Sequence, residues 1–390
     1  MKYIEYSCYL IIFLIPAYLI RFSIFGVPTN FLEVMIAGVF LALTACNLQL
    51  ATKILKSLVV GRKLLGIGIA LLFLGLILGV IISLDTQKSL GALKSWLVAP
   101  LVFSFVARSV FDTQEKRENA LRALALSGIS VACVGLVYLL LGITTFDARL
   151  GAFYESPNML AMYIAPTILI LSGLNSKFKV QSSKFLRPAL VSFSIVTCYL
   201  LLVTCLFLTR SLGSIYALAV AIFLSPVLVG RQKHATIFSY IALFALSLPF
   251  SSLFLNPWEW GRSSLASRLM IWKSALAILR DHWFLGIGAA TFQVYYLAYQ
   301  KYFPPYLEWA VPQPHNIFLA TWLYAGILGI AGFSLILFWF FREIQNTKNP
   351  AALVLAGLMI FLLVVGAIDN SLWRGDAAMM FWLVTLGVFG

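Results

Sequence analysis

The chain has 390 residues, of which 62% are hydrophobic and only 11% are charged. Soluble globular domains usually contain about 25% charged residues, so this composition excludes an ordinary soluble fold. The net charge of +14 does not indicate a nucleic-acid partner, because the basic residues cluster in short connections between apolar runs, as membrane topology requires.

Repeated apolar runs of about 20 residues predict membrane-spanning helices. A transmembrane barrel would instead show alternating segments of about ten residues. We therefore predict an all-α integral membrane protein with about twelve transmembrane helices. The predicted spans are 6–21, 31–47, 64–84, 90–108, 119–143, 158–175, 188–208, 211–229, 235–255, 315–341, 350–369 and 374–390.

Lys and Arg are divided unequally between the two sets of connections. With the N-terminus in the cytoplasm, 17 of the 28 basic residues fall on the cytoplasmic side, at the N-terminus and in or beside the connections after every second span. An excess of Lys and Arg marks that side of a membrane protein. Both termini are therefore predicted to be cytoplasmic.

The longest polar interruption lies between the ninth and tenth spans, on the predicted outer face. It holds five basic residues and five of the ten tryptophans of the chain. A loop of this length is either functional or disordered, and disorder requires few aromatic residues. We predict a folded outer-face loop at 256–314, between spans 1–9 in residues 1–255 and spans 10–12 in residues 315–390.

Part of this loop is predicted to be an amphipathic helix on the membrane surface. Its basic groups would then lie at the depth of the lipid head groups. Arg268 is a candidate ligand-binding residue there, although it could equally extend its charge toward lipid phosphates. The apolar positions with helical spacing are Leu265, Leu269, Trp272, Leu276 and Leu279, flanked by Arg268 on one margin and by Lys273 and Arg280 on the other.

His315 is the strongest candidate for chemistry among the three histidines. Pro312 and Pro314 stiffen the chain before it, and the tenth span begins at His315. The positive end of that helix disfavours an imidazolium, so the ring stays neutral and can accept a proton. The structural alternative is a histidine that merely caps the start of the helix.

Two further arginines lie at the predicted outer face. Arg210 stands between two apolar runs that leave almost no loop, and an arginine so close to hydrocarbon usually has a partner or a ligand. No acidic residue is near it in sequence, so an anionic substrate is a reasonable partner. Arg149 could pair with Asp147 or Glu155, which favours a structural role, but it remains a candidate for substrate binding.

The sequence shows no phosphate-binding glycine loop, and no cluster of His, Cys and carboxylates with metal-ligand spacing. We therefore expect no metal site and no cofactor. Chemistry would rely on arginine to stabilise an anionic leaving group.

In this context several motifs resemble the bacterial O-antigen ligase and O-antigen polymerase superfamily. They are RLGAFYESPNMLA from Arg149, LTRSLGSIYAL around Arg210, Arg268 with Trp272, GIGAATF (Gly286 to Phe292) and HNIFLATWLYAGILGI (His315 to Ile330). These motifs cover about residues 149–330 in the expected order. Around Arg210 the chain reads Thr209-Arg210-Ser211, where the family often has Ser-Arg-Gly.

The resemblance implies an integral-membrane glycosyltransferase of the bacterial inner membrane, with membrane lipids around it. Such enzymes take a glycan from undecaprenyl diphosphate on the outer face and pass it to a hydroxyl acceptor. Ligases use a sugar of the lipid A core as acceptor, and polymerases use another lipid-linked glycan. The family's catalytic base falls on His315, and its diphosphate-binding arginines fall on Arg268 and Arg210. Arg149 and Asn316 are added as candidate substrate-binding residues.

Three alternatives remain open from the sequence. A polymerase differs from a ligase only in its acceptor, which the sequence does not identify. A small-anion transporter would need ionisable residues lining a path through the spans, where Glu33 is the clearest candidate. A structural assembly component would tolerate changes at His315 or Arg268.

Overall fold

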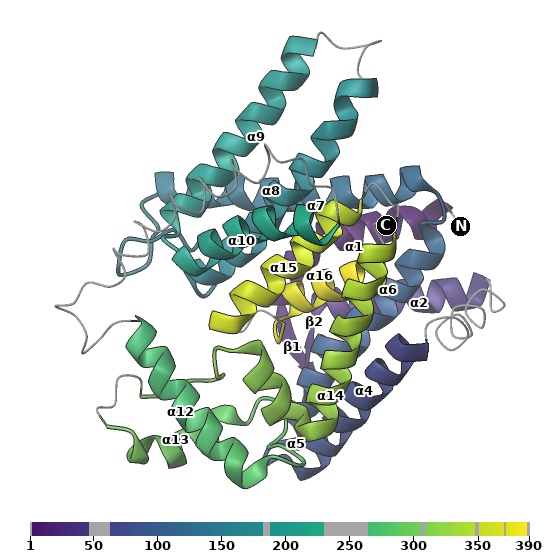
Figure 1. Cartoon of the computed structure of the whole chain (residues 1–390). Helices are drawn as coiled ribbons and strands as arrows, with labels where there is room; N and C mark the ends of the chain where they lie inside the picture. Colours follow the sequence, from purple (N-terminus) through teal and green to yellow (C-terminus); the bar gives the residue numbers. More distant parts are fainter. Residues whose placement is uncertain are drawn as a thin grey trace.

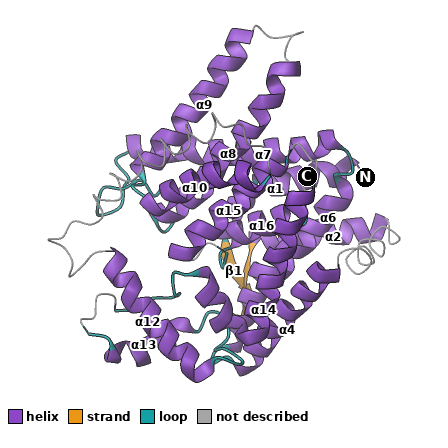
Figure 2. Ribbon diagram, in the orientation of Figure 1, coloured by secondary structure: helices purple, strands orange, loops and turns teal. Residues whose placement is uncertain are grey.

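A computed structural model describes residues 2–46, 63–181, 188–229, 264–304, 309–347, 351–369 and 372–387 (Figure 1). Nearly all of its regular structure is helical, and the strands in Figure 2 form one small hairpin, so the predicted all-α membrane class is confirmed. The described helices include α1 (Lys2–Phe13), α2 (Phe31–Cys46), α4 (Lys63–Ile82), α5 (Thr86–Leu93), α6 (Ala99–Val110), α7 (Gln114–Leu140), α8 (Pro157–Gln181), α9 (Pro188–Leu208), α10 (Leu212–Leu228), α12 (Ser264–His282), α13 (Phe292–Tyr299), α14 (Ile317–Asn346), α15 (Ala352–Ile368) and α16 (Gly375–Thr385).

Five described helical stretches are long and apolar enough to cross a membrane, and each coincides with a predicted span. They are Lys63–Ile82, Thr86–Val110, Gln114–Leu140, Pro157–Leu174 and Ile317–Asn346. Shorter apolar helices occupy the predicted spans at Phe31–Ala45, Ile195–Leu208, Leu212–Leu228 and Ala352–Ile368. The predicted span 235–255 lies outside the described residues, so the count of twelve stays a prediction.

The first predicted span is shorter than the sequence suggested. The helix α1 ends at Phe13, and a 3-10 turn (Ile15–Leu19) with Pro16 in its first turn follows. Proline has no backbone N–H to continue an α-helix, which explains the early end. The chain then forms a hairpin of β1 (Arg21–Ile24) and β2 (Val27–Asn30). Its two turn residues, Phe25 and Gly26, both have positive φ, as a type I′ turn requires.

Helices α4 and α14 run side by side because glycines line their contact (Figure 1). A Cβ added at Gly75 would lie only 2.3 Å from the carbonyl oxygen of Ala325, and one at Gly332 only 2.5 Å from that of Gly68. Small residues let two membrane helices approach until their backbones touch. This closely packed pair supports the predicted outer-face loop.

Helix α14 is broken at Gly326, where φ is 61° and ψ is −161°. The loop between α12 and α13 enters the break and takes over the freed backbone groups. Ile287 N–H donates to the carbonyl of Leu323 at 2.6 Å, and Ile327 N–H donates to that of Phe284 at 3.0 Å. Non-helical backbone at membrane depth needs such internal partners. The break therefore fastens the outer loop to α14.

Part of the predicted outer-face loop forms helix α12, but the apolar residues of this helix are oriented differently from the expectation. Met270, Ile271 and Leu279 are buried against the protein, whereas Leu269 and Leu276 are 46% and 56% exposed. The line of apolar positions expected on one face is therefore shared between the protein and the exterior. Helix packing against the α14 side decides this division.

The connections predicted to be outer meet one another at one end of the bundle, and two predicted inner segments meet at the other. At the first end Arg21 pairs with Glu155 at 3.1 Å, and Leu150 N–H donates to the carbonyl of Leu208 at 3.0 Å. At the second end Arg108 donates to the carbonyl of Gly387 at 3.2 Å. The alternation of the chain between two faces therefore agrees with the predicted topology.

A topology reporter tests which face is outside. Fused within 256–305, it should be active only outside the cytoplasm, and fused within 176–183, only inside, because Lys and Arg accumulate on the second side. Alkaline phosphatase and green fluorescent protein fusions measure the two locations. The reverse pattern would contradict an outer-face site.

Candidate functional site

His315 lies just before α14 rather than inside it. Its backbone adopts φ of 47°, a left-handed conformation uncommon outside glycine. The helix begins two residues later, at Ile317, and Asn316 is its N-cap. The imidazole is therefore carried by a bent segment at the entrance to the helix, and its side chain is 29% exposed.

Asp369 is the partner of His315. It follows the last residue of α15, is only 8% exposed, and places Oδ1 at 2.9 Å from Nδ1 of His315. An ionised carboxylate can only accept a hydrogen bond, so Nδ1 is the donor in this contact, and in a neutral ring Nε2 then has the lone pair. This arrangement equips Nε2 to accept a proton from a substrate.

Arg268 approaches the other oxygen of the same carboxylate. Its Nη2 lies 3.9 Å from Oδ2 of Asp369, and its side chain is 22% exposed. One turn further along α12, the indole of Trp272 donates to the carbonyl of His315 at 3.3 Å. The outer loop thus brings a guanidinium and a histidine to one buried carboxylate.

Asn316, predicted to bind substrate, is occupied by the fold. Its Oδ1 accepts from the N–H groups of Phe318 and Leu319, both at 3.0 Å. Its Nδ2 donates to the carbonyl of Ala367 at 2.9 Å. These bonds join the start of α14 to the end of α15, which are the elements that carry His315 and Asp369. The geometry favours a positioning role for Asn316.

Arg210 lies in the tight connection between α9 and α10, also with positive φ, and its side chain is exposed. Three residues later, Gly213 packs against Ile368, where a Cβ would lie 2.7 Å from the Ile368 Cδ1 atom. Ile368 directly precedes Asp369. Arg210 therefore lies at the same end of the bundle as His315, although its guanidinium forms no hydrogen bond or ion pair with another described residue.

Arg149 is held by three neighbours. Its Nε donates to the carbonyl of Thr209 at 2.7 Å and its Nη2 to Asn158 at 2.7 Å, while Nη1 lies 3.6 Å from Asp147. Of the two acidic partners considered, the structure therefore selects Asp147, because Glu155 pairs with Arg21 instead. These contacts fix the residue next to Arg210 and favour a structural role for Arg149.

The pKa of the Asp147 carboxyl group is lowered from its ordinary value, so the group is ionised at neutral pH. A hydrogen bond from the Thr145 hydroxyl, at 2.5 Å, is the largest cause of its lowered pKa, and the charge of Arg149 contributes further. The loop that anchors Arg149 is thus built around a persistent negative charge.

Asp369 was not selected as a site residue from the sequence. It is 54 positions from His315 in the sequence, and no motif surrounds it that would mark it as a site residue. The available signal was an acidic residue at the outer end of an apolar run. Among the described residues, no group of three or more His, Cys, Asp or Glu is arranged to hold a metal ion.

Comparison with known proteins gives one family match. Residues 197–334 match the family model described as O-antigen ligase. The matched segment begins in α9 and ends in α14, and it contains Arg210, Arg268, His315 and Asn316. No curated protein matches the chain. The family match confirms the resemblance that the sequence motifs indicate.

Proposed function

Because residues 197–334 match the O-antigen ligase family model, we propose that this chain transfers a glycan from an undecaprenyl-diphosphate carrier to a hydroxyl acceptor. The reaction would take place on the outer face of the inner membrane. The observation that carries the proposal is the contact of His315 Nδ1 with Asp369 at 2.9 Å, beside Arg268. This arrangement brings a base, His315, and a cation, Arg268, together in one partly buried site.

In the proposed reaction, the acceptor hydroxyl loses its proton to Nε2 of His315 as its oxygen attacks the anomeric carbon. The bond between that carbon and the diphosphate oxygen breaks, and its electron pair stays on the diphosphate. Arg268 and Arg210 would stabilise this added negative charge. Asp369 would hold the imidazole in the required tautomer and stabilise the imidazolium that forms. No metal enters this scheme.

The acceptor separates the two forms of the activity. We propose the ligase form, with a lipid A core sugar as acceptor; the alternative is a polymerase, with a second lipid-linked glycan as acceptor. Both forms share the proposed base and arginines. Purified protein given the same donor with each acceptor in turn, in the presence of EDTA, would identify the form.

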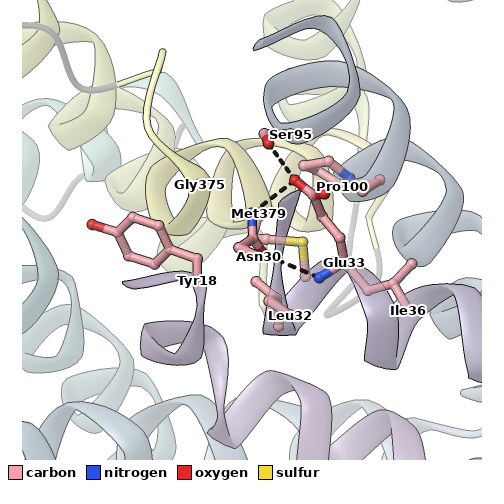
Figure 3. Close-up of a pocket in the computed structure, with 10 residues that line it drawn as sticks. Tyr18, Asn30, Leu32, Glu33, Ile36, Ser95, Pro100, Gly375 and Met379 are labelled. Carbon is pink, nitrogen blue, oxygen red and sulfur yellow. Dashed lines mark hydrogen bonds between the residues drawn. The ribbon is translucent and has the colours of Figure 1, made fainter. Parts of the chain in front are cut away.

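The clearest ionisable candidate for a transport path, Glu33, lines a small pocket (Figure 3). Its carboxylate accepts from Asn30 Nδ2 at 2.7 Å and from the Ser95 hydroxyl, and it pairs with Lys94 at 2.9 Å. The cavity beside it has a volume of about 10 Å³, enough for about one water molecule. Glu33 is thus held in a local polar network that fastens the hairpin, which favours a structural role.

Replacement of Arg268 tests the proposed diphosphate contact. Arg268→Ala should lower transfer about ten- to a hundredfold, because a hydrogen bond to a charged group contributes about 1.5–3 kcal/mol. Arg268→Lys should restore only part of the activity, since it keeps the charge but loses the guanidinium fork. Initial rates at several donor concentrations measure the effect.

Arg280→Ala is the matched control, because Arg280 lies on the same helix, is exposed and pairs with its neighbour Asp281. It should leave transfer unchanged. Equal activity of Arg268→Ala and wild type would show that Arg268 does not hold the diphosphate. Unchanged transfer after substitution of both Arg268 and His315 would favour the structural assembly component.

A further inference from the structure

A cavity of about 150 Å³ opens at the end of the bundle opposite His315. Residues at the ends of α6, α14 and α16 and at the start of α15 line it. It has about ten times the space that one water molecule needs. The cavity can therefore hold a small polar group.

Opposite charges line this cavity. Arg108, at the end of α6, donates to the carbonyls of Leu386 and Gly387 and is one of the residues that line the cavity. Glu343, on α14, is exposed and has no ion-pair partner among the described residues. A ligand that satisfies both groups needs an anionic part and a cationic part.

A buried hydroxyl gives a second, independent sign of a ligand. Thr385 also lines the cavity and is only 1% exposed. Its Oγ1 has no hydrogen-bond partner in the described part of the chain. Buried polar groups normally have a partner, so an oxygen or nitrogen atom from a bound molecule fits here.

Two aromatic side chains form part of the cavity wall. Trp339 and Phe340 line it about one turn before Glu343 along α14. Tryptophan is enriched where lipid head groups meet hydrocarbon. The distribution of Lys and Arg predicts that this end of the bundle lies on the cytoplasmic side.

We propose that this cavity binds the head group of a phosphatidylethanolamine from the inner leaflet. The phosphate faces Arg108, the primary ammonium donates to Glu343, and the hydroxyl of Thr385 bonds to a head-group oxygen. A carboxylate accepts hydrogen bonds from an ammonium but none from a trimethylammonium. The site therefore discriminates phosphatidylethanolamine from phosphatidylcholine, and it is independent of the proposed transfer reaction.

Lipid titration of the full chain tests this site. The protein is placed in phosphatidylcholine nanodiscs, and phosphatidylethanolamine or phosphatidylglycerol is added in steps while retained lipid is measured by native mass spectrometry. Wild type should retain phosphatidylethanolamine about tenfold better than phosphatidylcholine, as expected for one charge-assisted hydrogen bond. Glu343→Gln should abolish this preference, and Thr385→Val should weaken it.

Glu115→Gln is the matched control, because Glu115 is an exposed carboxylate at the start of α7, on the same predicted side and outside the cavity. It should keep the wild-type preference, and thermal unfolding in phosphatidylcholine should show that every variant is folded. No preference in wild type, or an unchanged preference in Glu343→Gln, would overturn the proposal. Stronger retention of phosphatidylglycerol would overturn it as well, because that lipid has no ammonium.

Discussion

His315→Gln should reduce the turnover of glycan transfer by roughly 10²- to 10⁴-fold, the usual contribution of a positioned general base. Glutamine keeps much of the size and hydrogen bonding of histidine but cannot take up the acceptor proton. Donor binding should persist, since the proposed diphosphate contacts belong to Arg268 and Arg210. Turnover with saturating acceptor and a separate donor-binding titration measure these two effects.

His282→Gln is the matched control. It lies in the same outer loop, with its ring edge-on to Tyr295 at 5.1 Å, away from Asp369. Near-normal turnover of His315→Gln would remove the base assignment and make Arg268 with a bound water the better candidate centre.

The membrane helices could be predicted because apolar length is a local property of the sequence. The hairpin at residues 21–30 was missed because the first apolar run continues almost to Arg21, which hides the early end of α1. A turn signal was present in Gly26, whose positive φ a glycine adopts freely.

The break in α14 could not be located from the sequence. Gly326, Gly329 and Gly332 all lie in one apolar run, and glycine is common in membrane helices. Only Gly326 leaves the helical conformation, because the loop that contains Ile287 supplies partners there. The choice among the three glycines is thus made by a segment about 40 residues upstream.

The candidate site shows the same division between local and distant information. His315 and Arg268 stand out through a rigid approach and a helical pattern, both of which are local. Asp369 acquires its place only when Asn316 joins the start of α14 to the end of α15 through the carbonyl of Ala367. A residue defined by such a long-range contact has no signature in a single sequence.

Asp369→Asn should lower turnover on the order of 10²- to 10⁴-fold while the protein remains folded and binds donor. Asparagine keeps the size of the side chain, but its amide can donate to Nδ1 of His315 and so place the histidine proton on Nε2. The lone pair that accepts the acceptor proton is then lost; the analogous change in a Ser-His-Asp triad costs about 10⁴ in kcat for this reason. Loss of the negative charge also frees Arg268 from Oδ2, which lies 3.9 Å away.

A spectroscopic readout separates this role from a merely structural one. In protein labelled with ¹⁵N-histidine, the His315 signals should report the Nδ1–H tautomer in wild type and the Nε2–H tautomer in Asp369→Asn. Asp281→Asn is the matched control, because Asp281 accepts a hydrogen bond from the Tyr299 hydroxyl at 2.7 Å and does not contact His315. It should leave tautomer and turnover unchanged. If Asp369→Asn kept both the wild-type tautomer and wild-type turnover, the carboxylate would only fasten α15 to α14, and His315 would have to act without an orienting partner.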